Sequence, residues 1–75
     1  MLATNIHILK TDLSDLSGVK EIQSFLNQHP SVIRWNVDLE DVDNVLKAET
    51  LPNFSETDFI EALRIQGVRC AALPD

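Results

Sequence analysis

The segment 31–39, SVIRWNVDL, constrains the fold most, because its side chains alternate between apolar and polar. Apolar Ile33, Trp35, Val37 and Leu39 alternate with polar Arg34, Asn36 and Asp38. Successive side chains of a β-strand point to opposite faces, so this pattern predicts a strand with one face in the core and one in water. We therefore expect a sheet that is covered on one side and open on the other.

Two helices are predicted on either side of this strand. The first runs from Ser17 or Gly18 to about His29-Pro30, because one apolar stripe recurs at helical spacing, and Asp15 or Ser17 is its expected N-cap. The second starts at Ser55, which precedes Asp58 by three residues as in a capping box, and it ends at Gly67.

Further strands are predicted at residues 5–11, 45–50 and 68–73, with an acidic hairpin turn at 40–44. The order strand, helix, strand, strand, helix, strand predicts an α+β, ferredoxin-like βαββαβ sandwich in one domain, residues 1–75. Its four-stranded antiparallel sheet has both helices on one face. The inward pattern places the aromatic side chains in the core: Phe25, Trp35, Phe54 and Phe59.

With these elements placed, the sequence resembles the heavy-metal-associated domain family, which includes small copper chaperones and modules of metal-transporting ATPases. The similarity extends from about Ile6 to Leu73. It is carried by KTDLS at 10–14, with Leu13 as an apolar anchor, by WNVDLE at 35–40, and by SETDFIEAL at 55–63 followed by Gly67. The resemblance implies the same fold and a metal-binding loop before the first helix.

The sequence departs from this family at the metal site. The family binds a soft metal ion through a C-x-x-C motif, and its two cysteine positions correspond here to Asp15 and Gly18. Linear Cu(I) coordination depends on polarisable sulfur, which a carboxylate does not replace. The resemblance therefore supports the fold and argues against the usual metal chemistry.

For the other acidic and hydroxyl side chains that could bind a metal ion, we expect a structural role. Acids and hydroxyls near the first helix are expected to form a capping network, with a hard-cation site as the alternative; they are Asp12, Ser14, Asp15, Ser17 and Glu21. The acidic run at 38–43 lacks calcium-loop spacing and is expected to be a solvated hairpin tip.

Cys70 and the two histidines are the remaining soft or borderline ligands. Cys70 is expected to pack as a small inward residue on the last strand, with a lone metal ligand or redox thiol as the alternative. His7 and His29 are expected near opposite ends of the helix layer, in surface or capping roles. No zinc site can be assembled from them.

Charge and composition restrict the partners. The net charge of −6 argues against binding to nucleic acid or to anionic membranes. No apolar run is long enough to span a membrane, no signal peptide is apparent, and a single cysteine suits a reducing compartment. We therefore expect a cytoplasmic protein without nucleic-acid or membrane partners.

The function predicted from the sequence is a non-catalytic interaction module of the heavy-metal-associated type, without a cofactor, because no catalytic arrangement is apparent. Its partner would be another protein or a second copy, bound at a sheet edge or on the open sheet face, which carries Arg34, Asn36, Asp38, Lys47 and Glu49. One alternative is binding or transport of copper or a weakly held divalent metal through Asp12, Asp15, Cys70 or a histidine. The second is an enzyme or small-molecule sensor that uses the sheet face.

Overall fold

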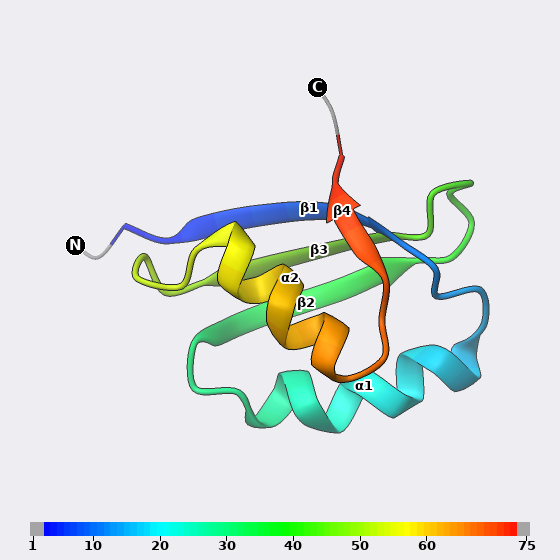
Figure 1. The fold of residues 1–75 in the computed structure, drawn as a ribbon, viewed down its shortest axis with the longest axis horizontal. Helices are drawn as coiled ribbons and strands as arrows, with labels where there is room; N and C mark the ends of the chain where they lie inside the picture. The colour runs from blue at the N-terminus through cyan, green and yellow to red at the C-terminus, as the bar shows by residue number, and fades with distance from the viewer. Residues whose placement is uncertain (1–2, 74–75) are drawn as a thin grey trace.

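The computed structural model describes residues 3–73 and has the predicted ferredoxin-like architecture (Figure 1). Its elements are β1 (Asn5–Thr11), α1 (Leu16–Gln28), β2 (Val32–Asp38), β3 (Val45–Thr50), α2 (Glu56–Ile65) and β4 (Cys70–Ala72). The four strands form one antiparallel sheet in the order β2-β3-β1-β4, and both helices cover the same face. The predicted fold class is confirmed.

Both helix starts are set by side-chain caps. Asp15 precedes α1 and its carboxylate accepts a hydrogen bond from the backbone N–H of Gly18 at 3.0 Å. Ser55 and Asp58 form a complete capping box at α2, as predicted. Each cap satisfies amide groups that have no partner within the first helical turn.

The last strand begins later than predicted because the residues before it complete the end of α2. Gly67 has φ = +89°, and the N–H groups of Gly67 and Val68 donate to the carbonyls of Arg64 and Leu63. This Schellman arrangement uses a left-handed residue that glycine adopts without strain. Because residues 67 and 68 complete the helix, β4 begins at Cys70 and not at 68.

The alternation in β2 is broken at one position. Val32 pairs with Thr50 and Arg34 with Glu49, so Ile33 is an extra residue in a β-bulge. Val32, Trp35 and Val37 pack against the core, whereas Ile33 is 46% exposed. The expectation that Ile33 shares the inward face with Trp35 is therefore wrong, because a bulge changes which residues share a face.

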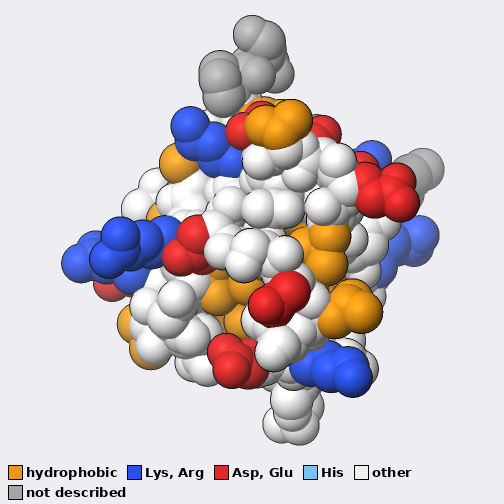
Figure 2. Space-filling view, turned by 90° about the vertical axis from the view of Figure 1, so that its right-hand side faces the viewer, with side chains coloured by type: hydrophobic (Ala, Val, Ile, Leu, Met, Phe, Trp, Pro, Cys, Tyr) orange, Lys and Arg blue, Asp and Glu red, His pale blue; other side chains and the backbone are white. Residues whose placement is uncertain are grey.

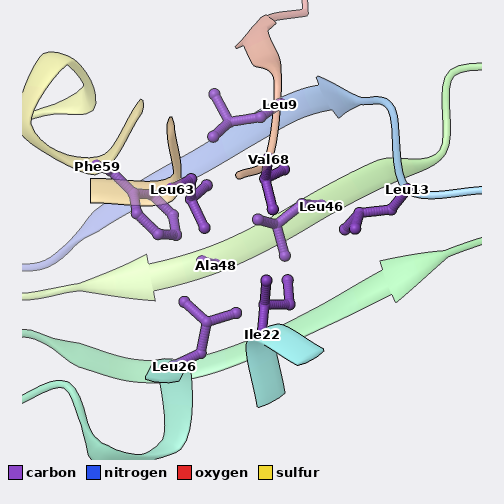
Figure 3. Packing of buried hydrophobic residues seen from close by; sticks show 9 residues of the cluster. All are labelled: Leu9, Leu13, Ile22, Leu26, Leu46, Ala48, Phe59, Leu63 and Val68. Carbon is purple, nitrogen blue, oxygen red and sulfur yellow. The ribbon is translucent and has the colours of Figure 1, made fainter. Parts of the chain in front are cut away.

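The core lies between the helices and the sheet (Figure 3). It contains the fully or nearly buried side chains of Leu9, Leu13, Ile22, Leu26, Leu46, Ala48, Phe59, Leu63 and Val68. Of the four predicted core aromatics, Phe59 is fully buried, and the other three are partly buried against this cluster. The aromatic prediction is confirmed, with Phe59 in the most central position.

His7 does not have its predicted surface or capping role, whereas His29 is the C-cap of α1, one of the roles predicted for it. His7 is buried on β1, its ring packs edge-on against Phe59, and its Nε2 lies 2.8 Å from the Thr50 hydroxyl oxygen. His29 follows α1 and packs on Phe54, which in turn contacts Phe59. The two histidines therefore lie at opposite ends of one aromatic chain, His7–Phe59–Phe54–His29, and not at opposite ends of the helix layer; His7 has a core role in place of a surface role.

Candidate functional site

Asp15 and Gly18, the two positions that correspond to the cysteines of heavy-metal-associated domains, lie where β1 leads into α1. Asp15 is the N-cap of α1 and Gly18 is its third helical residue. The 3.0 Å bond from the Gly18 N–H occupies Oδ1 of Asp15. The carboxylate at the first ligand position thus stabilises the helix start.

Gly18 lies at a close approach to the loop. A Cβ built on Gly18 would lie 3.2 Å from Cδ2 of Leu13. Leu13 is buried, as its predicted anchoring role requires. Any side chain at the second ligand position would therefore require the tip of Leu13 to move by a few tenths of an ångström.

Asp12 does not join the capping network predicted at the first helix. Its backbone N–H donates to the Arg69 carbonyl at 3.0 Å, and its Oδ1 accepts from the Arg69 N–H at 3.1 Å. Asp12 therefore joins the end of β1 to the segment before β4. The prediction is correct for Asp15 and wrong for Asp12, because the partner of Asp12 is far away in the sequence.

Cys70 packs inward from β4, as predicted. It pairs with Thr11 of β1, is partly buried against the core, and is not in a disulfide. Burial raises the pKa of the Cys70 thiol, and the nearby Asp12 carboxylate raises it further. Both effects disfavour the thiolate, which is the form that binds metals and acts as a nucleophile.

Two carboxylates of the hairpin between β2 and β3 accept hydrogen bonds from backbone groups close to them in the sequence. Asp38 and Asp41 each accept a hydrogen bond from the N–H two residues later, at 3.0 and 2.9 Å, which stabilises the hairpin turn. Figure 2 shows acidic side chains scattered over this end of the molecule, with apolar side chains between them and basic ones at the margins. Within residues 3–73, no three His, Cys, Asp or Glu side chains are grouped as metal ligands, and the predicted ligands Asp12, Asp15 and Cys70 form no such group.

The second candidate site is the open face of the sheet. The register places Arg34 beside Glu49 and Asn36 beside Lys47, and Asp38 follows on the same face, as predicted. The Nε of Arg34 lies 3.1 Å from Oε1 of Glu49, whose Oε2 accepts from the Thr4 hydroxyl at 2.8 Å. The predicted polar residues thus share the open face, and two of them, Arg34 and Glu49, form an ion pair on it.

Sequence reasoning missed the apolar centre of this face. Ile6 lies beside Glu49 and Ile8 beside Lys47, and these isoleucines are 54% and 42% exposed. They point outward because His7 and Leu9 of the same strand point into the core. A shallow hollow on this face is lined by Ile6, Arg34, Trp35, Asn36, Lys47, Ala48 and Glu49.

Comparison of the chain with protein-family models and with curated proteins finds no match. The resemblance to heavy-metal-associated domains therefore stays a prediction. Within the part of the chain that the structure describes, neither helix is long and apolar enough to cross a bilayer.

Proposed function

We propose that this chain is a non-catalytic protein-interaction module of the heavy-metal-associated type, which binds a partner protein on the open sheet face and holds no soft metal ion. The observation that carries the proposal is the pair of exposed isoleucines, Ile6 and Ile8, at the centre of that face. Protein interfaces commonly combine an apolar centre with a polar rim.

The charged residues around the isoleucines suit such an interface. Arg34 is 77% exposed on its side chain but is paired with Glu49, so its charge is partly compensated before a partner arrives. Lys47 and Asn36 lie side by side next to Ile8. A partner with an apolar centre and polar groups of both signs would fit this surface, whereas a polyanion would not.

The chemistry of the loop supports the second half of the proposal. The carboxylate of Asp15 caps α1, Gly18 offers no ligand atom, and the pKa of the Cys70 thiol is raised by burial and by Asp12. These features disfavour the alternative in which Asp15 and Cys70 hold a metal ion. The proposed location is the cytoplasm, where a single cysteine remains reduced.

The interaction is tested by proximity labelling or cross-linking in cells with wild-type protein and the variant Ile6→Glu/Ile8→Glu. A matched control is Ile65→Glu, because Ile65 is 73% exposed on α2, away from the sheet. We expect at least one protein to be enriched by wild type and by the control but lost with the double variant. Equal enrichment by all three folded proteins would contradict the proposed binding face.

A further inference from the structure

The two edges of the sheet differ in length. The edge strand β4 has three residues, Cys70–Ala72, whereas the opposite edge strand β2 has seven, Val32–Asp38. An edge strand presents unpaired backbone N–H and C=O groups that can pair with another strand. Proteins commonly block such edges with lysine, proline or a bulge. In β2 the bulge lies at Ile33, which leaves 34–38 regular and free of lysine and proline.

The side chains of this regular segment are complementary to a second copy of themselves. In an antiparallel pair centred on Asn36, Arg34 of each copy lies opposite Asp38 of the other. Residues directly opposite each other share a face, so the two ion pairs would form on the open face, where both side chains are exposed. Trp35 would lie opposite Val37 on the helix face, where both already pack against the core.

The groups needed for these pairs are available. Arg34 contacts Glu49 through Nε, so the two terminal nitrogens of its guanidinium can donate to another carboxylate. Asp38 accepts from the Glu40 N–H through Oδ1, so Oδ2 can accept from a second arginine. Moving the centre by one residue to Trp35 would place Arg34 opposite Asn36 and lose both ion pairs. Charge complementarity therefore selects the register centred on Asn36.

The side of α1 beside this edge is mostly uncharged. The Nε1 of Trp35 donates to Oδ1 of Asn27 at 2.8 Å, which identifies the side of α1 nearest β2. The hollow on this side of α1 is also lined by Gln23, Ser24 and Gln28, which are uncharged, and by Lys20 near the start of the helix. Two α1 helices brought together by edge pairing would therefore meet mainly through amide and hydroxyl groups, with Lys20 as the charged residue of this side.

We infer that β2 pairs with β2 of a second copy of this chain, antiparallel and centred on Asn36, to form one sheet that is continuous across both copies. The inference goes beyond the proposed function, because it uses the sheet edge and does not need the isoleucine face to bind anything. Such a short interface is small, so we expect a weak dimer with a Kd of about micromolar or above.

Sedimentation over a concentration series tests the dimer and its ion pairs. We expect wild type to shift from 8.4 kDa towards twice that mass as concentration rises. In Asp38→Arg, two arginines would face each other across each contact, so its dissociation constant should rise at least tenfold. The matched control is Asp41→Arg, which has the same charge change and loses the same type of turn bond but lies outside the strand. A wild type that stays monomeric at millimolar concentration, or a dimer that Asp38→Arg does not weaken, would overturn the inference.

Disulfide trapping tests the register. Asn36 lies on the proposed two-fold axis, so Asn36→Cys in a Cys70→Ala background should oxidise rapidly to a linked dimer, because opposed residues in antiparallel strands have Cα atoms within disulfide range. Lys47→Cys in the same background is the control, since Lys47 neighbours Asn36 on the same face but lies on the interior strand β3. Equal trapping of both variants would overturn the proposed pairing, whatever the result of the partner experiment.

Discussion

Gly18 and Leu13 approach so closely that a Cβ on the glycine would lie 3.2 Å from the leucine Cδ2. The contact joins the first turn of α1 to the loop that precedes it. It occurs at the second of the two positions where the heavy-metal-associated family would place a cysteine. Leu13 therefore packs against the space that a side chain at position 18 would occupy. A larger residue at position 18 would displace only the end of the Leu13 side chain.

Introducing a thiol at each of these two positions should therefore create a metal site. We expect Asp15→Cys/Gly18→Cys to bind Cu(I) tightly in a one-to-one ratio, with Leu13 shifting slightly. Loss of the Asp15 cap should lower the free energy of unfolding by about 0.5–2 kcal/mol. Chelator competition measures the first effect and urea denaturation the second.

The matched control is Asp15→Ser/Gly18→Ser, which makes nearly the same steric change without thiols and should not bind Cu(I). If the dicysteine variant folds but binds no more copper than the diserine variant, the loop does not have the geometry that the resemblance implies.

The buried pair His7 and Thr50 should show strong energetic coupling. The ring nitrogen Nε2 of His7 lies 2.8 Å from the threonine hydroxyl oxygen, inside the core. Thr50→Val leaves a buried ring nitrogen without this partner, and a buried polar group left unpaired costs about 1–3 kcal/mol. His7→Leu/Thr50→Val should lose less stability than the two single changes summed. Urea denaturation of all four proteins gives the coupling energy, and simple additivity would show that the contact does not stabilise the fold.

Cys70 should react slowly with alkylating reagents in the folded protein. Burial and the Asp12 carboxylate raise its pKa above the ordinary value of 9.0, so the thiolate fraction at neutral pH is reduced. The pH profile of iodoacetamide alkylation should have its midpoint above 9.0, whereas the same chain in urea should not show this shift. A folded profile with its midpoint at or below the urea value would refute the assignment.

The raised pKa of Cys70 also predicts how the free energy of unfolding changes with pH. A raised pKa means that folding favours the neutral thiol, so its contribution is fully present below about 9 and is lost as the pH rises through the folded pKa. Wild type should therefore lose more stability than Cys70→Ala as the pH rises above 9.0 and through the folded pKa of the thiol. Parallel losses in thermal melts would exclude a contribution from this thiol.

Most of the fold could be predicted from local patterns. The strands β1 and β3 have the predicted bounds, and both caps form as Asp15, Ser55 and Asp58 indicate. These features depend on neighbours in the sequence. The face presented by β1 could not be predicted in this way, since Ile6 and Ile8 are as apolar as Leu9 but point outward.

The other features that differ from the sequence prediction also depend on contacts between residues far apart in the sequence. The bulge at Ile33 depends on the pairing of β2 with β3, and the burial of His7 depends on Thr50 and Phe59 from distant segments. The partner of Asp12 is Arg69, at the other end of the chain. For the candidate site, the charged residues of the open face could be predicted from alternation, but its apolar centre could not.

The central claim is that this scaffold lacks a site for a soft metal ion, and titration of the reduced wild-type protein with Cu(I) against a competing chelator tests it most directly. We predict that the chelator retains the copper and that Cys70→Ala behaves like wild type. Tight one-to-one transfer of Cu(I) to the wild-type protein would contradict the claim.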